Sequence, residues 1–262
     1  MSSASRKSER VLLPRTLDPV WDLLDLLHQK AKAKDAKLID KVKVLIVVID
    51  FSDAFFQIPL GFIERRFAVV QFRGKYYVFT RAPQGSRGAP LLWSRVCALC
   101  CRLALATCSQ TTTRINAHVD DPEIAAVGTE AENNRALTKI IISWLAIGLK
   151  LAFNKAAIAE EGSPITWTSS KQTINNFTVT AEVKEEIARK VRDEVNRFLK
   201  TNVISLVDFR AFLGRCVCVA GLLHVWRPFV AMMWAPLNHP ESQGSAPPGC
   251  LWRPAVDILF GG

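Results

Sequence analysis

The sequence has no apolar run that could cross a bilayer. Its apolar runs, such as VLIVVI at residues 44–49, are far shorter than the roughly 20 residues that a spanning helix needs. The first ten residues, MSSASRKSER, contain no apolar signal core. We therefore expect no membrane partner and an intracellular protein, with nothing to favour the cytoplasm over the nucleus.

Cysteine spacings typical of metal sites are also scarce. Among seven cysteines only Cys97 and Cys100 form a CxxC, and no second pair stands at zinc-ribbon spacing. The number is odd, and most of these cysteines lie in apolar, helix-like stretches. This pattern indicates reduced, buried thiols and excludes a disulfide framework.

The bulk composition is that of a folded domain with a basic surface. The chain has 262 residues, 49% of them hydrophobic and 22% charged, which supports one large core or two smaller ones and excludes a disordered chain. Lys and Arg outnumber Asp and Glu by 34 to 24, for a net charge of +10. A polyanionic partner is favoured, although ribosomal and membrane-surface proteins share this balance.

Four segments differ in pattern along the chain. Residues 44–180 read as a strand, a hairpin, a helix, a second hairpin, another helix and short strands, which predicts an α+β domain with helices on one face of a sheet. Residues 181–236 are helical only, and residues 237–262, rich in Pro, Gly and Ser, predict a flexible tail. Residues 1–43 contain one amphipathic helix, whose expected apolar face comprises Val20, Leu23, Leu24 and Leu27.

Two adjacent aspartates stand where a tight hairpin is expected. In AHVDDPEIAAVG (117–128), alternating apolar residues flank Asp120 and Asp121, which predicts two paired strands. A solvated turn would explain the pair, but so would a metal site with a third carboxylate. Asp50, at the end of the buried strand VLIVVID, could supply it; alternatively, Asp50 caps a turn and Asp53 starts a helix.

At this point the sequence resembles the reverse transcriptases of retroelements. Four blocks match that family in order: IDFSDAFFQIPL, RAPQGSRGAPLLWSRV, HVDD and GLKLAFNKAAI. The segment VDFRAFLGRCVCVAGLLHVWRPF is similar to the thumb-side segment of gypsy-type and tyrosine-recombinase-type elements. The resemblance covers roughly residues 44–236. It implies a polymerase palm, an antiparallel sheet with helices on one face, followed by a helical thumb-like segment.

The resemblance also implies a metal site. Asp50 and Asp120 would hold two Mg²⁺ ions, with Mn²⁺ as an alternative, and Asp121 would support them as a third ligand. Lys155 would approach the leaving pyrophosphate and neutralise its charge or donate a proton. A lone lysine after a helix is otherwise a solvated surface charge.

Further residues would contact the nucleotide and the primer. Phe51 and Phe55 follow the first catalytic aspartate, and Phe55 falls where the family carries an aromatic that blocks a ribose 2′-hydroxyl. Gln84 and Gly85 fall where the family contacts the incoming nucleotide, and glycine permits close backbone approach. His118 would lie near the primer end.

The match departs from the family in three places. His118 replaces the Tyr or Phe that opens the Asp-Asp box, and Pro122 removes a backbone donor from the returning strand. Residues 1–43 resemble only the last part of the family's fingers region, so we expect a chain that is truncated at the fingers and comprises palm and thumb-like segments. We find no block that resembles an RNase H, a protease or an integrase.

Three functions remain open at this point. The first is an RNA-directed DNA polymerase that transfers dNTPs to a primer on an RNA or DNA template. The second is an inactive retroelement remnant that at most binds nucleic acid. The third is a metal-dependent nuclease that uses Asp50, Asp53 and Asp120, against which the block PQGSRGAP argues, because a nuclease needs no nucleotide-contact block there.

Overall fold

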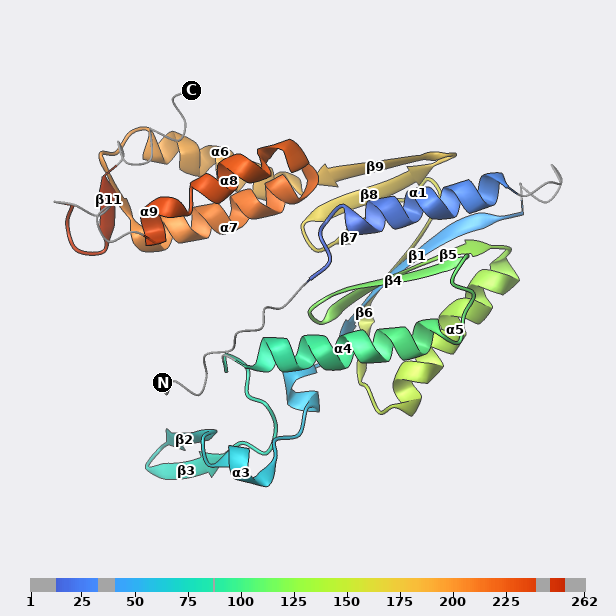
Figure 1. Ribbon diagram of the computed structural model, residues 1–262, viewed down its shortest axis with the longest axis horizontal. Coiled ribbons are helices and arrows are strands. Elements are labelled where there is room, and N and C mark those ends of the chain that lie inside the picture. Colours follow the sequence, from blue (N-terminus) through green and yellow to red (C-terminus); the bar gives the residue numbers. More distant parts are fainter. Residues whose placement is uncertain (1–12, 33–40, 87, 239–245, 253–262) are drawn as a thin grey trace. The chain divides into compact units, whose positions relative to one another are not determined.

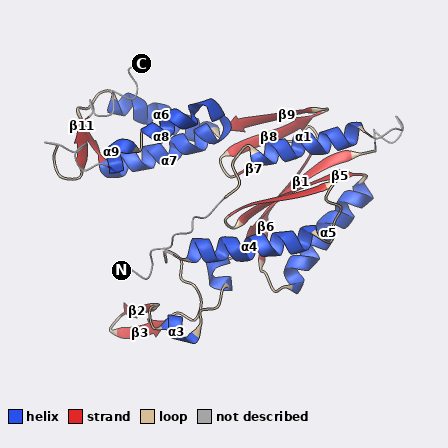
Figure 2. Ribbon diagram, viewed as in Figure 1, coloured by secondary structure: helices blue, strands red, loops and turns tan. Residues whose placement is uncertain are grey.

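The computed structural model describes residues 13–32, 41–86, 88–238 and 246–252. The chain divides into two compact units (Figures 1 and 2). The sheet unit lies within residues 1–168 and 173–180, and the helical unit within residues 169–172 and 181–262. Across the described ranges, every helix is too short or too polar to cross a membrane.

A four-stranded antiparallel sheet, with strand order β4-β5-β1-β6, forms the centre of the sheet unit. Its strands are β1 (Lys43–Phe51), β4 (Thr113–His118), β5 (Asp121–Gly128) and β6 (Leu151–Glu160). The run of β-branched residues in β1 suits a central strand that is buried on both faces. The expected hairpin is confirmed: β4 pairs with β5, and His118 faces Asp121.

Helices α4 (Ala89–Leu105) and α5 (Glu130–Ala146) cover one face of this sheet, as Figure 1 shows. Alternate residues of β1 point into the core between them, namely Val47, Ile49 and Phe51. The expected α+β architecture, an antiparallel sheet with helices packed on it, is therefore confirmed. Because side chains alternate along a strand, the remaining residues of β1 must be buried on the other face.

Helix α1 (Asp18–Ala31) covers that second face. Its buried apolar residues are Leu23, Leu26 and Leu27, whereas Leu24 is exposed. The apolar face expected from the sequence was therefore wrong: the face that is buried is rotated from it by part of a turn about the helix axis. The α1 residues pack against Val44, Ile46 and Val48 of β1 and against Ala125 and Val127 of β5.

The ends of α5 follow the sequence signals. Thr129 accepts a hydrogen bond from the Glu132 amide, and the Glu132 carboxylate accepts one from the Thr129 amide at 2.8 Å. These reciprocal bonds form a capping box. The Thr129 amide and hydroxyl, which both donate to the Glu132 carboxylate, lower the pKa of Glu132. Gly148, at φ +92°, lies just beyond the helix in a conformation that favours glycine.

Another hairpin, formed by β2 (Val69–Phe72) and β3 (Lys75–Val78), is inserted between β1 and α4. It corresponds to the first hairpin expected in residues 44–180. Short helices η2 (Ala54–Gln57) and α3 (Phe62–Arg65) precede it. Every residue of both strands is exposed.

Short strands were expected before the helical unit, and three are present among the described residues. They are β7 (Ile165–Trp167), β8 (Ser170–Asn175) and β9 (Thr178–Val183), in the order β7-β8-β9. Ile165, Trp167 and Ile174 belong to the core that α1 forms with the central sheet.

The helical unit contains α6 (Glu185–Phe198), α7 (Leu206–Leu222), η3 (His224–Trp226), α8 (Arg227–Met232) and α9 (Ala235–Asn238). Part of the segment expected to be a flexible tail is ordered. Its strand β11 (Cys250–Trp252) pairs with β10 (Val203–Ser205), because fully buried Leu251 belongs to this unit's core. Residues 239–245 and 253–262 lie outside the described residues.

Candidate active site

The Asp-Asp hairpin closes through a two-residue turn. Because His118 pairs with Asp121, only Val119 and Asp120 remain between the strands. Val119 has a φ of +60°, a conformation that is strained for a β-branched residue. We refer to Val119, Asp120 and Asp121 as the Asp turn.

Three donors hold the three carbonyl oxygens of the Asp turn. The Trp93 indole Nε1 donates to Val119 O at 2.7 Å, and the Phe51 amide donates to Asp120 O at 2.8 Å. The Trp167 indole Nε1 donates to Asp121 O at 2.9 Å. These donors come from α4, β1 and β7, so the strained turn is fixed by three separate elements.

An open cleft of about 400 Å³ lies beside this turn. It brings together six of the residues that the resemblance indicated: Asp50, Phe51, Phe55, Gln84, Asp120 and Lys155. Asp53, Phe56 and Asn154 also line it. Its acidic residues come from the end of β1, from the loop after it and from the Asp turn. Strands distant in sequence thus place their carboxylates in one cleft.

Lys155 lies in a bulge of β6. Asp50 pairs with Ala152 and Val48 with Ala157, so β6 advances five residues while β1 advances two. The extra residues loop out at this point, and the Lys155 Nζ donates to Asp50 Oδ2 at 2.9 Å. The lysine side chain is otherwise exposed. The bulge therefore aims a cation at Asp50, the first of the three aspartates that line the cleft.

The lining of the cleft has a net negative charge, with three carboxylates and one ammonium group. The hydrogen bond to Asp50 and its charge raise the pKa of Lys155, and the charges of Asp120 and Asp53 add to this shift. The described residues that line the cleft include neither cysteine nor histidine. A set of oxygen donors with net negative charge fits a hard divalent cation such as Mg²⁺. Within the described residues, however, no three acidic, His or Cys side chains converge closely enough to form a ligand set by themselves.

Asp121 and His118 do not line this cleft. Asp121 is half-buried at the start of β5. Because side chains alternate along a strand, Asp121 is on the same face of β5 as Ala125 and Val127, which face α1. The His118 ring meets the Trp167 ring edge to face, with centroids 6.3 Å apart. Trp167 therefore contacts the hairpin at both a backbone carbonyl and a side chain.

The two phenylalanines near Asp50 differ in their surroundings. Phe51 is only 2% exposed, and its ring packs edge-on against Trp93 and Trp144. The strand points this ring into the core, although Phe51 is also among the residues that line the cleft, so its contact with the nucleotide stays a prediction. Phe55 lines the cleft and packs against the edge of the same core.

Gln84 and Gly85 lie in the loop before α4. Gln84 lines the cleft and is exposed. Gly85 has a φ of +87° and open space where a side chain would stand, so glycine is required here by the backbone and not by crowding.

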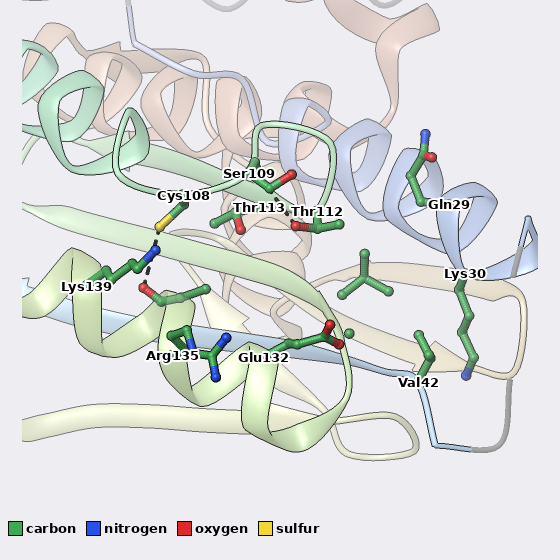
Figure 3. A pocket seen from close by; sticks show the side chains of 13 residues that line it. Gln29, Lys30, Val42, Cys108, Ser109, Thr112, Thr113, Glu132, Arg135 and Lys139 are labelled. Carbon is green, nitrogen blue, oxygen red and sulfur yellow. Dashed lines mark hydrogen bonds between the residues drawn. The ribbon is translucent and has the colours of Figure 1, made fainter. Parts of the chain in front are cut away.

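A second hollow, of about 440 Å³, lies at the other end of the β4–β5 hairpin (Figure 3). Two of its cations have partners: Lys30 binds Glu161 at 2.6 Å, and Lys139 donates to Thr107 O at 3.1 Å. Glu132 is used by the α5 cap. This hollow therefore offers no counterpart to the paired aspartates.

Sequence reasoning missed Trp93 and Trp167. A tryptophan in an apolar stretch indicates a core residue, and both are indeed buried. Nothing in the local pattern shows that each indole N–H points at the Asp turn. Only the packing of α4 and β7 against the hairpin reveals these contacts.

Comparisons with known proteins agree with this arrangement. Residues 5–200 match the family described as reverse transcriptase (RNA-dependent DNA polymerase). No curated protein sequence matches the chain.

Solved structures with a similar fold include two foamy viral protease–reverse transcriptases. One, in complex with an RNA/DNA hybrid, is 17% identical with a TM-score of 0.53, and the match covers 83% of this chain and 27% of that one. The other, in complex with double-stranded DNA, is 19% identical with a TM-score of 0.52, and the match covers 83% of this chain and 35% of that one. This chain thus spans about a third or less of the length of these relatives. The profile match and the shared fold lead to one conclusion: the chain belongs to the reverse transcriptase (RNA-dependent DNA polymerase) family.

Proposed function

We propose that the chain catalyses nucleotidyl transfer from a dNTP to a primer 3′-hydroxyl on an RNA or DNA template. The observation that carries this proposal is the placement of Asp50 and Asp120 in one cleft, beside Phe55 and Gln84. The similar solved structures hold an RNA/DNA hybrid and double-stranded DNA. This supports a template-primer as the partner, as does the net charge of +10.

In this proposal Asp50 and Asp120 hold Mg²⁺, or Mn²⁺ in its place. When bound, the metal would activate the attacking oxygen and stabilise the leaving one. Asp121 supports the turn from the other side of the hairpin. Its placement outside the cleft makes it a positioning residue in this proposal and not a metal ligand.

The remaining cleft residues orient and select the nucleotide. Lys155 is held near the reacting groups by Asp50, and its raised pKa keeps it cationic, suited to a phosphate or pyrophosphate oxygen. The Phe55 ring excludes a 2′-hydroxyl by steric contact. Gln84 contacts the nucleotide, and Gly85 lets the backbone approach it.

Primer extension tests this proposal. The purified chain is assayed on poly(rA) primed with oligo(dT), with Mg²⁺ and then Mn²⁺, beside Asp50→Asn and Asp120→Asn. We expect extension that each substitution lowers by at least about 1000-fold, because removal of a group that acts on the transition state costs several kcal/mol. Asp193→Asn, on an exposed residue of α6, is the matched control and should extend normally.

Template binding is measured in parallel. Both cleft variants should bind the template-primer at least as tightly as the parent chain, because loss of a negative charge reduces repulsion. A folded parent chain that binds but does not extend in either metal would contradict the polymerase and leave the inactive remnant. Cleavage of the template that depends on Asp50 and Asp120 would instead identify a nuclease.

A further inference from the structure

The β2–β3 hairpin exposes an unusual amount of aromatic surface. Both tyrosines of the chain lie in β3, with Tyr76 74% exposed and Tyr77 50% exposed. Phe67 and Phe72, at 78% and 57%, lie just before and at the end of β2. A two-stranded ribbon of this kind is marginally stable without a partner, and exposed aromatic patches mark binding sites.

The register gives each face of the ribbon one tyrosine. Residues opposite each other in an antiparallel pair share a face. Gln71 therefore accompanies Tyr76 on one face, and Val70 accompanies Tyr77 on the other. The turn between the strands has φ of +50° at Arg73 and +73° at Gly74, which matches the type I′ geometry of a tight hairpin. The rings are thus presented by a short, regular turn.

The segment is strongly basic. Residues 62–81 contain five cationic side chains, Arg65, Arg66, Arg73, Lys75 and Arg81, against one carboxylate, Glu64, for a net charge of +4. Glu64 accepts a hydrogen bond from the Gly61 amide at 3.2 Å. The partner that fits this charge is a polyanion.

Cations and rings are interleaved at short distance. The Arg66 guanidinium lies 4.6 Å from the centroid of the Phe67 ring, and that of Arg73 lies 5.1 Å from the Phe72 ring. Aromatic faces that stack on bases, combined with cations that follow the phosphates, are the components of single-strand nucleic-acid sites. Bases in a duplex are already stacked, so the rings gain less from double-stranded partners.

The base of the hairpin adjoins the candidate active site. Phe79, one residue beyond β3, stacks on Phe56 with ring centroids 6.4 Å apart, and Phe56 lines the cleft beside the Asp turn. Backbone bonds from Leu60 N to Thr80 O and from Ala82 N to Ile58 O tie the ribbon to buried Ile58 and Ala82. The hairpin is therefore within reach of a nucleic-acid strand that extends from the cleft.

We propose that this hairpin surface (Phe67, Phe72, Arg73, Lys75, Tyr76 and Tyr77) binds unpaired nucleic acid. It stacks bases on the rings, and Arg73 and Lys75 contact the phosphates. A second copy of the chain is a poorer occupant, because it would bring the same net charge of +4 against this one. The site needs neither the cleft carboxylates nor a metal, so it stands apart from the polymerase proposal.

Fluorescence anisotropy tests this site in the full chain carrying Asp120→Asn, which separates binding from catalysis. The probes are a labelled oligo(dT) and the same strand annealed to its complement. We expect Tyr76→Ala to weaken single-strand binding at least about fivefold and Tyr76→Phe to restore it, since the ring remains. Arg73→Gln should reduce the slope of log affinity against log salt concentration by about 0.7 in magnitude, which corresponds to the loss of one phosphate contact. Trp21→Ala, at an aromatic of α1 that is 66% exposed, is the control and should bind normally.

A photocrosslink gives a second readout that does not depend on substitution. An oligonucleotide with 5-iodouracil should attach to a peptide that contains Tyr76 or Tyr77. Unchanged affinity in Tyr76→Ala, or equal loss for duplex and single strand, would overturn the proposal. A dimer in sedimentation that Tyr76→Ala dissolves, with DNA affinity unchanged, would assign the surface to a second copy instead.

Discussion

The indole N–H of Trp93 donates a 2.7 Å hydrogen bond to the carbonyl oxygen of Val119. Trp93 is fully buried in α4, and Val119 is the strained residue directly before Asp120. A helix in the core thereby fixes the backbone that aims a cleft carboxylate. The contact links the stability of the core to the geometry of the site.

Trp93→Phe should therefore affect both stability and extension. Phenylalanine keeps most of the ring but leaves Val119 O without its donor, which costs about 1–3 kcal/mol of unfolding free energy, measured by urea denaturation. We expect kcat to fall with little change in KM. Trp144→Phe is the control, because Trp144 is equally buried but donates to Cys100 O; it should lose stability and keep kcat. Equal kcat losses in both variants would refute a specific role for Trp93.

Lys155→Gln should separate function from stability. The lysine is exposed, so the melting temperature should hardly change, whereas extension should fall because a phosphate-binding cation is lost. Its raised pKa means that the Asp50 contact is complete at pH below about 10.4 and is lost only as pH rises through the higher folded-state value. NMR titration of the lysine ammonium groups measures the pKa of Lys155 in the folded state, and the Lys155→Gln variant assigns its signal. A Lys155 pKa below the ordinary lysine value would contradict the observed pairing.

Phe55→Val should relax the choice of sugar. A smaller side chain at the cleft wall opens space for a 2′-hydroxyl, so ribonucleotide incorporation should rise on the order of tenfold or more relative to dNTPs. Ratios of kcat/KM for dTTP and UTP give the measurement. Phe56→Val, at the neighbouring ring that also lines the cleft, is the control. An unchanged ratio in Phe55→Val would mean that another residue selects the sugar.

Thiol labelling tests the buried cysteines. Burial and the charge of Glu194 raise the pKa of Cys216 to about 11, and burial raises that of Cys100. Both should react slowly with a disulfide reagent at pH 8, whereas half-buried Cys218 and Cys250 should react first. Because the folded state holds the Cys216 proton more tightly, its contribution to stability should decline as pH rises from about 8.5 towards 11. Rapid labelling of Cys216 in folded protein would contradict this environment.

The local signals in the sequence were sufficient for most elements of the sheet unit. The β-branched run before Asp50 and the alternation around the Asp pair each predict a structure that depends on neighbours along the chain. The apolar face of α1 was predicted less well, since Leu24 is exposed and Leu26 buried. Successive residues lie about 100° apart around a helix, and the surface on which the helix packs decides which part of its circumference is buried.

The site was predicted less completely than the fold. Resemblance correctly indicated that Asp50 and Asp120 would share a cleft, because their block order implies adjacent strands. It did not distinguish Phe51 from Phe55, although strand parity sends the first ring into the core. The β6 bulge that aims Lys155 at Asp50 also has no local signal, because neither Gly nor Pro marks it. The assignment to gypsy-type or tyrosine-recombinase-type elements stays a prediction.

The three carbonyl bonds of the Asp turn have a consequence for folding. Trp93 and Trp167 lie 26 and 46 residues from the carbonyls that they bind, so neither bond can form in an isolated hairpin. Contacts of such sequence separation form late and cooperatively, and amides that they protect exchange only in large opening events. The Phe51 amide, bonded to Asp120 O, should thus be among the slowest to exchange with deuterium. The site then exists only in molecules whose sheet unit is completely assembled, and partly folded chains would carry the aspartates without their geometry.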